Sequence, residues 1–344
     1  MRFKQLESFH YSLFTIHIFT HPLIADSRFP YICRMSSPVI CIGATLIDEL
    51  YFCHEKTVAA TSNPAVMKRY AGGVTRNIAQ QLASLEIPVQ LITVLGNDPD
   101  GEWLKEDCMK NAIGMDAVRR VDDNTGKYAS ILDADGSLYA AACTDPCGKY
   151  LDPVFLREQT GLLNSAFMII ADTNLAEESL SWLAAFSREK NIPLLIEPVS
   201  VAKACKLSRV DISGIFMITP NEDELPSLCK DIHDSIGGCM QELFERGVEN
   251  IWLRKGEQGS EIFNRKENIA LHAPVISITD STGAGDAALA GWVAAYYHGY
   301  DAVKCLQAGH TLAIEVLQVH GAVIPGFTKE QLFHSIKKYY PDEQ

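Results

Sequence analysis

The feature that most constrains the fold of this chain is a repeated alternation, from Val39 onward, between short apolar runs and segments with helical periodicity. Such an alternation is typical of buried strands in a mostly parallel sheet whose two faces are both covered by helices. The sequence therefore predicts an α/β fold that binds ligands at the carboxyl ends of its strands. We expect strands at 39–44, 89–94, 167–171, 193–197, 215–218 and 251–254, and helices at 76–86 and 177–190.

Two segments interrupt this alternation. Residues 50–70 lack a clear helical period, and residues 127–143 contain two strand-like runs joined by a turn at 133–136. The second segment predicts a β-hairpin outside the main sheet, because a glycine-containing loop joins two short strands. Such a hairpin can form a lid over an α/β core or extend the edge of the main sheet, and the pattern fits both.

Composition narrows the functional classes. The chain has 344 residues, of which 47% are hydrophobic and 21% charged, and it has no internal repeat, so we expect one globular catalytic unit. Its formal net charge of −13 argues against nucleic acid and anionic membranes as partners. A small anionic ligand is compatible with that charge, because backbone N–H groups can bind one locally. The ten cysteines include no CxxC pair, which indicates reduced thiols in a cytosol-like compartment.

The N-terminal 37 residues differ from the rest of the chain. The apolar stretch 9–24 is interrupted by histidine, serine, threonine and proline, so it is too broken for a membrane span. It fits a loosely ordered extension, a poor signal peptide or an organellar presequence. We expect an extension over 1–37 and a cytoplasmic protein, with the peroxisome or mitochondrion as the alternative if the extension is a presequence.

The most informative motif is the glycine-rich run 280–286 (DSTGAGD), which precedes an alanine-rich segment with strong helix propensity. The N–H groups of Gly283, Ala284 and Gly285 would lie unpaired at a helix N-terminus, where anions bind. Asp286, in the first turn, could accept the proton of an attacking hydroxyl while these amides hold a phosphoryl group. The helix dipole is expected to lower its pKa. A structural glycine-rich turn capped by Asp286 would give the same pattern.

A second glycine pair, Gly72 and Gly73, also opens a predicted helix. Backbone N–H groups there, together with the side-chain amide of Asn77, could bind the hydroxyls of a polyol. Arg76 could add a contact to a base or a phosphate. A purely structural helix start fits the same residues.

A third motif, 219–224 (TPNEDE), directly follows the predicted strand at 215–218. If a helix begins here, Asn221 and Glu224 lie on one face of it. They could then hold the waters around an Mg²⁺ ion bound to nucleotide phosphates. An acidic helix N-terminus, favoured by the helix dipole, would look the same.

Three single positions carry weaker signals. Asp48 closes the first strand segment, where a carboxylate can accept two sugar hydroxyls or simply form a turn. Lys255 and Gly256 follow a strand and could line a nucleotide pocket, although a lysine at a strand end is commonly just solvated.

Neither a GxxxxGK[ST] loop nor a GxGxxG helix start occurs, which argues against P-loop and dinucleotide-binding enzymes.

These motifs together resemble those of the ribokinase-like (PfkB) carbohydrate kinase family. The early glycine pair with its asparagine and the late run 280–286 resemble the two family signatures, although Ser281 stands where threonine is usual. Residues 96–101 and 221–224 are similar to the family's G-x-D-x-x-G turn and N-x-x-E element. The motifs fall in family order along nearly the whole chain beyond the extension.

This resemblance implies a kinase domain over residues 38–340, with a central mostly parallel sheet, helices on both faces and a small β lid near 48–70 and 124–145. It implies transfer of the γ-phosphate of ATP to a primary hydroxyl, with Mg²⁺ and, in many members, a monovalent cation such as K⁺. Family members are often homodimers through their lids, and some are monomers.

The resemblance also implies roles for individual residues. Asp286 would be the catalytic base, with Gly283, Ala284 and Gly285 as the anion hole. The nucleoside would be bound by Asp48, Gly72, Gly73, Arg76, Asn77, Tyr128 and Asn174, and ATP by Asn221, Glu224, Lys255, Gly256 and Thr282. Mg²⁺ would be held through water by Asn221 and Glu224, and a monovalent cation by Asp280 and Thr282.

Within the family, residues 72–79 (GGVTRNIA) are most similar to the pseudouridine kinases, whose loop reads G-G-V-x-R-N. Residues 125–128, 171–175 and 197–200 also resemble that subfamily, and Glu197 stands where ordinary ribokinases more often carry aspartate. The resemblance implies phosphorylation of the 5′-hydroxyl of pseudouridine. A ribokinase or adenosine kinase type of activity, or a catalytically inactive nucleoside-binding member, is the alternative.

Overall fold

The computed structural model describes residues 36–341 of the chain. All but the last two residues of the predicted extension therefore lie outside the described residues, and its nature stays a prediction. Within 36–341, no helix is both long and apolar enough to cross a lipid bilayer.

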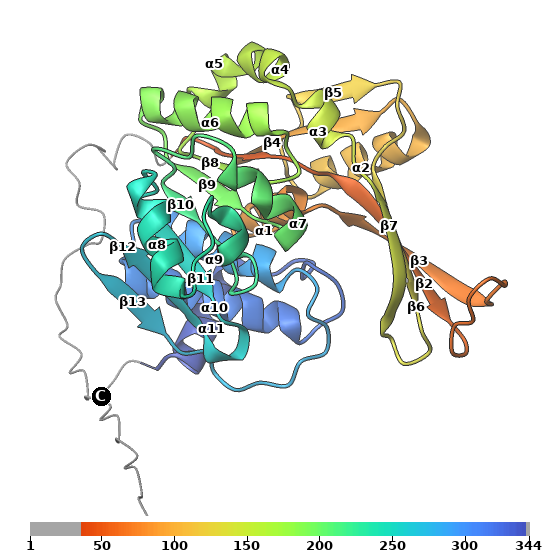
Figure 1. Ribbon diagram of the computed structural model, residues 1–344. Coiled ribbons are helices and arrows are strands. Elements are labelled where there is room, and N and C mark those ends of the chain that lie inside the picture. Colours follow the sequence, from red (N-terminus) through yellow and green to blue (C-terminus); the bar gives the residue numbers. More distant parts are fainter. Residues whose placement is uncertain (1–35, 342–344) are drawn as a thin grey trace, which may run out of the picture.

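The described chain forms two β-sheets (Figure 1). Their strands are β1 (Val39–Ile42), β2 (Leu46–Cys53), β3 (Ala65–Gly72), β4 (Val89–Gly96), β5 (Val118–Val121), β6 (Lys127–Leu132), β7 (Leu138–Thr144), β8 (Met168–Asp172), β9 (Leu194–Glu197), β10 (Met217–Ile218), β11 (Asn250–Arg254), β12 (Ser260–Asn264) and β13 (Asn268–Leu271). The central sheet has nine strands in the order β13-β12-β11-β10-β9-β8-β1-β4-β5, and only the pairs β11–β12 and β12–β13 are antiparallel. The second sheet has four strands in the order β3-β2-β6-β7, and we call it the lid sheet.

Helices cover both faces of the central sheet. They are α1 (Val74–Ser84), α2 (Pro99–Lys110), α3 (Cys147–Tyr150), α4 (Pro153–Glu158), α5 (Thr160–Leu163), α6 (Glu177–Lys190), α7 (Val201–Ala204), α8 (Ile236–Glu245), α9 (Ala284–Tyr297), α10 (Ala302–Leu317) and α11 (Lys329–Tyr339), with 3₁₀ turns η2 (Cys205–Ser208), η3 (Leu225–Leu228) and η4 (Gly256–Gln258). One hydrophobic core lies under α1, α2 and α9 to α11, and a second lies under α3 to α8.

Strand β1 shows why both faces of the central sheet must be covered by helices. Val39 and Cys41 belong to one core, whereas Ile40 and Ile42 belong to the other, because successive side chains of a strand point to opposite faces. All four are fully buried. The predicted α/β class is therefore confirmed, and helix α6 has the bounds expected from the sequence, 177–190.

The lid sheet projects from the body beside α2 (Figure 1). Lys127 of the lid sheet pairs with Asp100 of α2 at 2.7 Å and with Glu49 at 3.1 Å, so one face of the lid sheet is tied to the body. Asp48 and Tyr128 are neighbours of these tied residues along their strands and lie opposite each other in the β2–β6 register. They therefore point from the other face of the lid sheet. The hairpin predicted at 127–143 forms part of this separate sheet, and the alternative of an edge on the main sheet is wrong.

Two glycines let α9 and α10 pack in close contact. A Cβ added at Gly291 would lie 2.5 Å from the carbonyl oxygen of Ala308, and one added at Gly309 would lie 2.7 Å from that of Ala288. No side chain fits between backbones at these distances. This contact fixes the position of α9, whose first turn carries Asp286.

We expect Gly291→Ala to destabilise the protein by about 1–3 kcal/mol, the usual cost of overpacking a tight core. The measurement is the midpoint of urea unfolding. Gly237→Ala is the matched control, because Gly237 is exposed near the start of α8 and its added Cβ would have a nearest neighbour 3.9 Å away. Equal midpoints for the two variants would contradict this account of the helix pair.

Candidate active site

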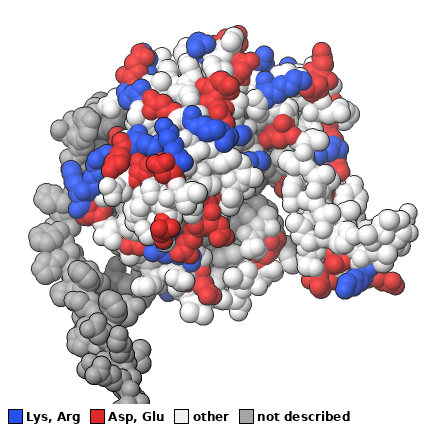
Figure 2. All heavy atoms as spheres, in the orientation of Figure 1, with Lys and Arg blue, Asp and Glu red and all other residues white. Residues whose placement is uncertain are grey.

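Strand ends and helix starts converge at one edge of the central sheet, as expected for an open α/β sheet. Asp172, Glu197 and Arg254 are the last residues of β8, β9 and β11. Asn77, in the first turns of α1, reaches Asp286 at the start of α9 by a hydrogen bond of 2.9 Å. Figure 2 shows a hollow between the body and the lid sheet.

Helix α9 begins directly after the glycine-rich turn, as the sequence predicts, but not all three predicted amides are unpaired. Gly283 is the N-cap residue with φ 75°, and a Cβ there would lie 2.4 Å from the Cα of Ala322, so only glycine fits. The N–H of Ala284 makes one long bond, 3.4 Å, to the carbonyl of Ser281. The N–H groups of Gly283, Gly285 and Asp286 donate to no other described residue. These amides are therefore free to bind an anion.

Asp286 lies beside these amides and is only 8% exposed. Burial raises the pKa of its carboxyl group to about 8, against the opposing effect of the hydrogen bond from Asn77. The sequence led us to expect a lowered pKa at a helix N-terminus. That expectation was wrong, because the loss of solvation outweighs the helix dipole.

The guanidinium of Arg76 is held by three protein acceptors. Its Nη2 donates to Asp107 Oδ2 at 2.6 Å, and its Nη1 donates to the Ala71 carbonyl at 3.0 Å and to Asn77 Oδ1 at 3.2 Å. The guanidinium thus donates a hydrogen bond to the side-chain oxygen of Asn77. The NH₂ group of Asn77 is therefore the part of that amide that faces Asp286. Arg76 therefore positions Asn77, and its predicted contact with a base or phosphate stays a prediction.

The lid sheet contributes a row of side chains from four strands. The register places Tyr70, Asp48, Tyr128 and Cys143 side by side on β3, β2, β6 and β7. A Cβ at Gly72 would lie 2.2 Å from Asp48 Oδ2, so the glycine makes room for this carboxylate. Burial raises the pKa of Asp48 to about 6, partly offset by the positive charge of Arg76. The predicted residues Asp48, Gly72 and Tyr128 are therefore brought together.

Gly73 and Asn174 lie at the base of this region. Gly73 has φ 104°, and a Cβ there would lie 2.2 Å from the Ala44 carbonyl oxygen. Asn174 follows β8 and is 6% exposed; its side-chain oxygen accepts a hydrogen bond from Lys203. Lys203 is therefore a cation next to Asn174, a predicted substrate residue. The sequence analysis did not predict Lys203.

Asn221 and Glu224 cap each other and do not begin an α-helix. The Asn221 N–H donates to Glu224 Oε2 at 3.0 Å, and the Glu224 N–H donates to Asn221 Oδ1 at 2.8 Å. These side chains satisfy the backbone locally, and Pro226 has no N–H to extend a helix, so a turn and η3 follow. The sequence analysis placed both side chains on one face if a helix began here, and no α-helix begins at this point. Glu224 Oε1 makes no hydrogen bond with another described residue.

Arg254 and Lys255, two cations at the end of β11, have different partners, and the predicted place of Lys255 in a nucleotide pocket stays a prediction. Lys255 pairs with Glu261 at 2.6 Å. Arg254 Nη2 donates to Glu197 Oε1 at 2.7 Å and also to the carbonyl of Thr219. Gly256 has φ 56°, and a Cβ built there would meet no heavy atom within 4 Å; its place in a nucleotide pocket stays a prediction.

Asp280 ties two loops together behind the α9 N-terminus. Its Oδ1 accepts from the Thr282 N–H at 2.9 Å and its Oδ2 from the Gly321 N–H at 3.0 Å. The two predicted cation-binding residues, Asp280 and Thr282, are thus adjacent. Gln81 of α1 supports the second loop through a bond of 3.1 Å to the Ala322 carbonyl.

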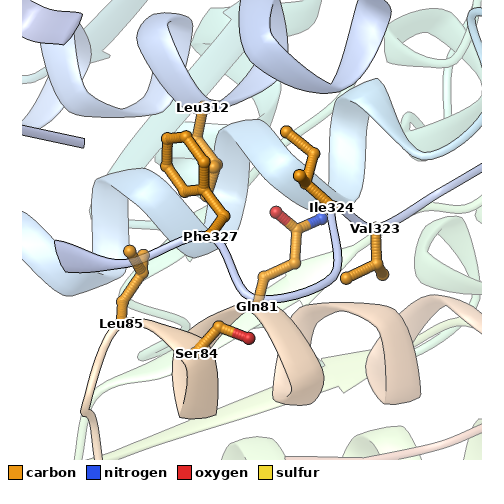
Figure 3. A pocket seen from close by; sticks show the side chains of 7 residues that line it. All are labelled: Gln81, Ser84, Leu85, Leu312, Val323, Ile324 and Phe327. Atoms are coloured by element: carbon orange, nitrogen blue, oxygen red, sulfur yellow. The ribbon is translucent and has the colours of Figure 1, made fainter. Parts of the chain in front are cut away.

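A small cavity lies next to this support (Figure 3). Gln81 points into it from α1, and apolar side chains of α10 and of residues 323–327 close it. It is too small and too apolar for a nucleoside, and we assign it no ligand. Its lining residues are Gln81, Ser84, Leu85, Leu312, Val323, Ile324 and Phe327.

Besides Lys203, three further residues were not predicted as site residues, because each acquires its partner only in the folded chain. Asp172 is fully buried and accepts hydrogen bonds from the Ala44 N–H at 3.1 Å and the Thr75 hydroxyl at 3.2 Å. Glu197 and Arg254 form the ion pair described above. The one available signal was shared: each is a charged residue that directly ends an apolar strand run.

Comparison with known proteins assigns the class. The pattern of the pfkB family carbohydrate kinases matches residues 37–329, most of the chain. A family of carbohydrate kinases consists of phosphotransferases that use an alcohol group as acceptor. The chain belongs to the pfkB family of carbohydrate kinases.

Individual relatives agree with that assignment. The chain is 28% identical over 289 residues to the pseudouridine kinase of Escherichia coli (strain K12), covering 82% of this chain and 91% of that protein. It is 24% identical over 354 residues to the pseudouridine kinase of Arabidopsis thaliana, covering 84% and 93%. The structure of Arabidopsis thaliana ribokinase complexed with ribose and ATP superimposes with a TM-score of 0.74 at 20% identity, covering 88% of this chain and 99% of that one.

The burial of Asp286 predicts a pH-dependent stability effect. An aspartate in an unfolded chain ionises near pH 4, whereas in the folded protein the pKa of Asp286 is about 8. Between these values the unfolded state binds fewer protons, so this residue destabilises the fold increasingly as pH rises. Asn cannot titrate, so Asp286→Asn should raise the thermal midpoint over wild type by more at pH 8 than at pH 5.

Thermal unfolding of both proteins across this pH range tests the prediction, because pH effects shared by both cancel in the difference. Asp234→Asn, at an exposed position, is the control and should give no such trend. A difference for Asp286→Asn that stays constant from pH 5 to pH 8 would show that the carboxyl group is not held neutral by burial.

Proposed function

We propose that this protein transfers the γ-phosphoryl group of ATP to the 5′-hydroxyl of pseudouridine and releases ADP and pseudouridine 5′-phosphate. The observation that carries the proposal is the pairing of a buried carboxyl group with unbonded amides at the start of α9. A hydroxyl held against Asp286 could lose its proton to that carboxylate. Phosphoryl oxygens held by the N–H groups of Gly283 and Gly285 would meet donors that need no rearrangement.

The residues present also fit Mg-ATP. The free Oε1 of Glu224 can accept a hydrogen bond from a metal-bound water, and the accessible backbone at Gly256 can contact a nucleotide. Bound Mg²⁺ neutralises negative charge on the phosphates. Asp280 and Thr282 are our candidates for a monovalent cation, because a carboxylate oxygen with one hydrogen bond keeps acceptor capacity.

The nucleoside would lie between the lid sheet and α1. Asp48 can accept two ribose hydroxyls, and Gly72 leaves room for that approach. Tyr128 lies beside Asp48 in the same row and can contact the base. Asn174 and its partner Lys203 supply donors and acceptors at the end of β8.

Pseudouridine is the proposed acceptor for two reasons. The G-G-V-x-R-N loop has a structural use here, since its arginine orients its asparagine toward Asp286. Two of the relatives that cover most of this chain are pseudouridine kinases.

A phosphoryl-transfer assay with Mg-ATP across pseudouridine, uridine, adenosine and ribose tests this proposal. We expect the highest kcat/KM with pseudouridine, and a higher rate when K⁺ is added. Faster turnover of ribose or adenosine would assign the protein to another kinase specificity. Binding of pseudouridine without turnover of any acceptor would make it an inactive nucleoside-binding member.

Asp286→Asn is the catalytic control in that assay. Loss of a positioned base should lower kcat by about 10²–10⁴ with little change in KM. Asp234→Asn, at an exposed position in the segment before α8, should retain wild-type rates.

The pH dependence gives an independent prediction. Because the pKa of Asp286 is raised to about 8, kcat/KM should rise with pH and level off above that value. Asn77→Leu removes a hydrogen bond that favours the ionised carboxylate, so the rise should move to higher pH. A flat profile, or a rise that moves to lower pH in the variant, would contradict the assignment of Asp286 as base.

A further inference from the structure

Arg254 is a charged side chain of the site whose hydrogen bonds are only partly used. It ends β11, and its Nη2 is occupied by Glu197 and the Thr219 carbonyl. Its Nη1 donates to no acceptor among residues 36–341. The side chain as a whole is 15% exposed, and Nη1 is not among the buried unpaired polar atoms of the described residues. This donor is therefore accessible to a ligand.

The free end of the guanidinium lies over the glycine-rich turn. A Cβ built on Gly285 would lie 2.7 Å from Arg254 Nη1 and 3.5 Å from its Cζ. Because Gly285 has no side chain, the guanidinium approaches the same stretch of backbone whose N–H groups are unbonded. A fixed positive charge and several amide donors therefore meet at one point.

The charges around Arg254 explain why a cation is needed there. Arg254 interacts electrostatically with Glu197, Glu224 and Asp286. Without it, these carboxylates would repel the phosphates of a nucleotide, in a chain whose net charge is already −13. The neighbouring Lys255 does not serve, since its ammonium group pairs with Glu261.

We infer that Arg254 is a further catalytic residue, whose Nη1 binds an oxygen of the phosphoryl group in transit while Glu197 holds the guanidinium in place. This inference rests on the kinase function proposed above. In the step, the acceptor oxygen bonds to the γ-phosphorus and the bond from that phosphorus to the bridging oxygen of ADP breaks. The hydroxyl proton goes to Asp286. Arg254 keeps all its protons and contributes charge and one hydrogen bond.

A variant series tests the inference. Arg254→Gln should lower kcat by about 10²–10³, the usual effect of losing a transition-state donor, with little change in the KM for the nucleoside. Arg254→Gly should lose as much, and guanidinium ions added to the buffer should restore at least about tenfold of it. Arg209→Gln is the matched control, because Arg209 forms a surface pair with Glu177. A kcat for Arg254→Gln within about threefold of wild type would overturn the inference.

A binding measurement decides the question without turnover. Aluminium fluoride added with Mg²⁺ and ADP mimics the phosphoryl group in transit, so wild type should bind ADP more tightly in its presence. Arg254→Gln should lose that gain and keep its affinity for ADP alone. If the gain survives in Arg254→Gln, or is absent in wild type, Arg254 has no such role. Failure of wild type to phosphorylate any acceptor would instead remove the proposed function, whatever the binding result.

Discussion

The burial of one carboxyl group at the start of α9 is the constraint on which the site depends. Burial, assisted by the negative charges of Glu197 and Asp172, raises the pKa of Asp286 to about 8, while the amide of Asn77 and the charge of Arg254 work in the opposite direction. Asn77 and Arg254 come from other elements, α1 and β11. The protonation of Asp286 is therefore set by tertiary structure, because α9 by itself would leave the carboxylate exposed and without this rise in pKa.

The site also requires neighbouring segments to approach each other closely. A glycine makes this approach possible at each of the following contacts. Gly73 lets α1 start against the Ala44 carbonyl, and Gly283 lets the turn before α9 pass the Cα of Ala322. At Gly285 the freed space is taken by a guanidinium. Each glycine of such a motif thus marks a position where a neighbouring backbone or side chain approaches closely. The sequence alone does not show which neighbour that is.

The fold was largely predictable because its signals are local. The apolar runs and helical periods predicted the α/β class, and α6 begins and ends where its period does. The site was predictable only in part, because its partners are distant in sequence. The Asn77–Asp286 bond spans 209 residues, and the Arg254–Glu197 bond spans 57. Patterns over a few residues marked Asn77 and Asp286 but could not show that Arg76 would bind Asp107 and the side-chain oxygen of Asn77.

Glu197 also acquires its role from partners that are distant in sequence. Its two oxygens accept hydrogen bonds from Arg254 at 2.7 Å and from the Thr219 hydroxyl at 2.6 Å. An aspartate here would have a side chain one methylene shorter, so its oxygens would lie closer to the end of β9. The longer acid is therefore matched to an arginine at the end of β11, and the two residues should be read as a unit. Together they place one fixed positive charge beside the amides that we propose bind the phosphoryl group.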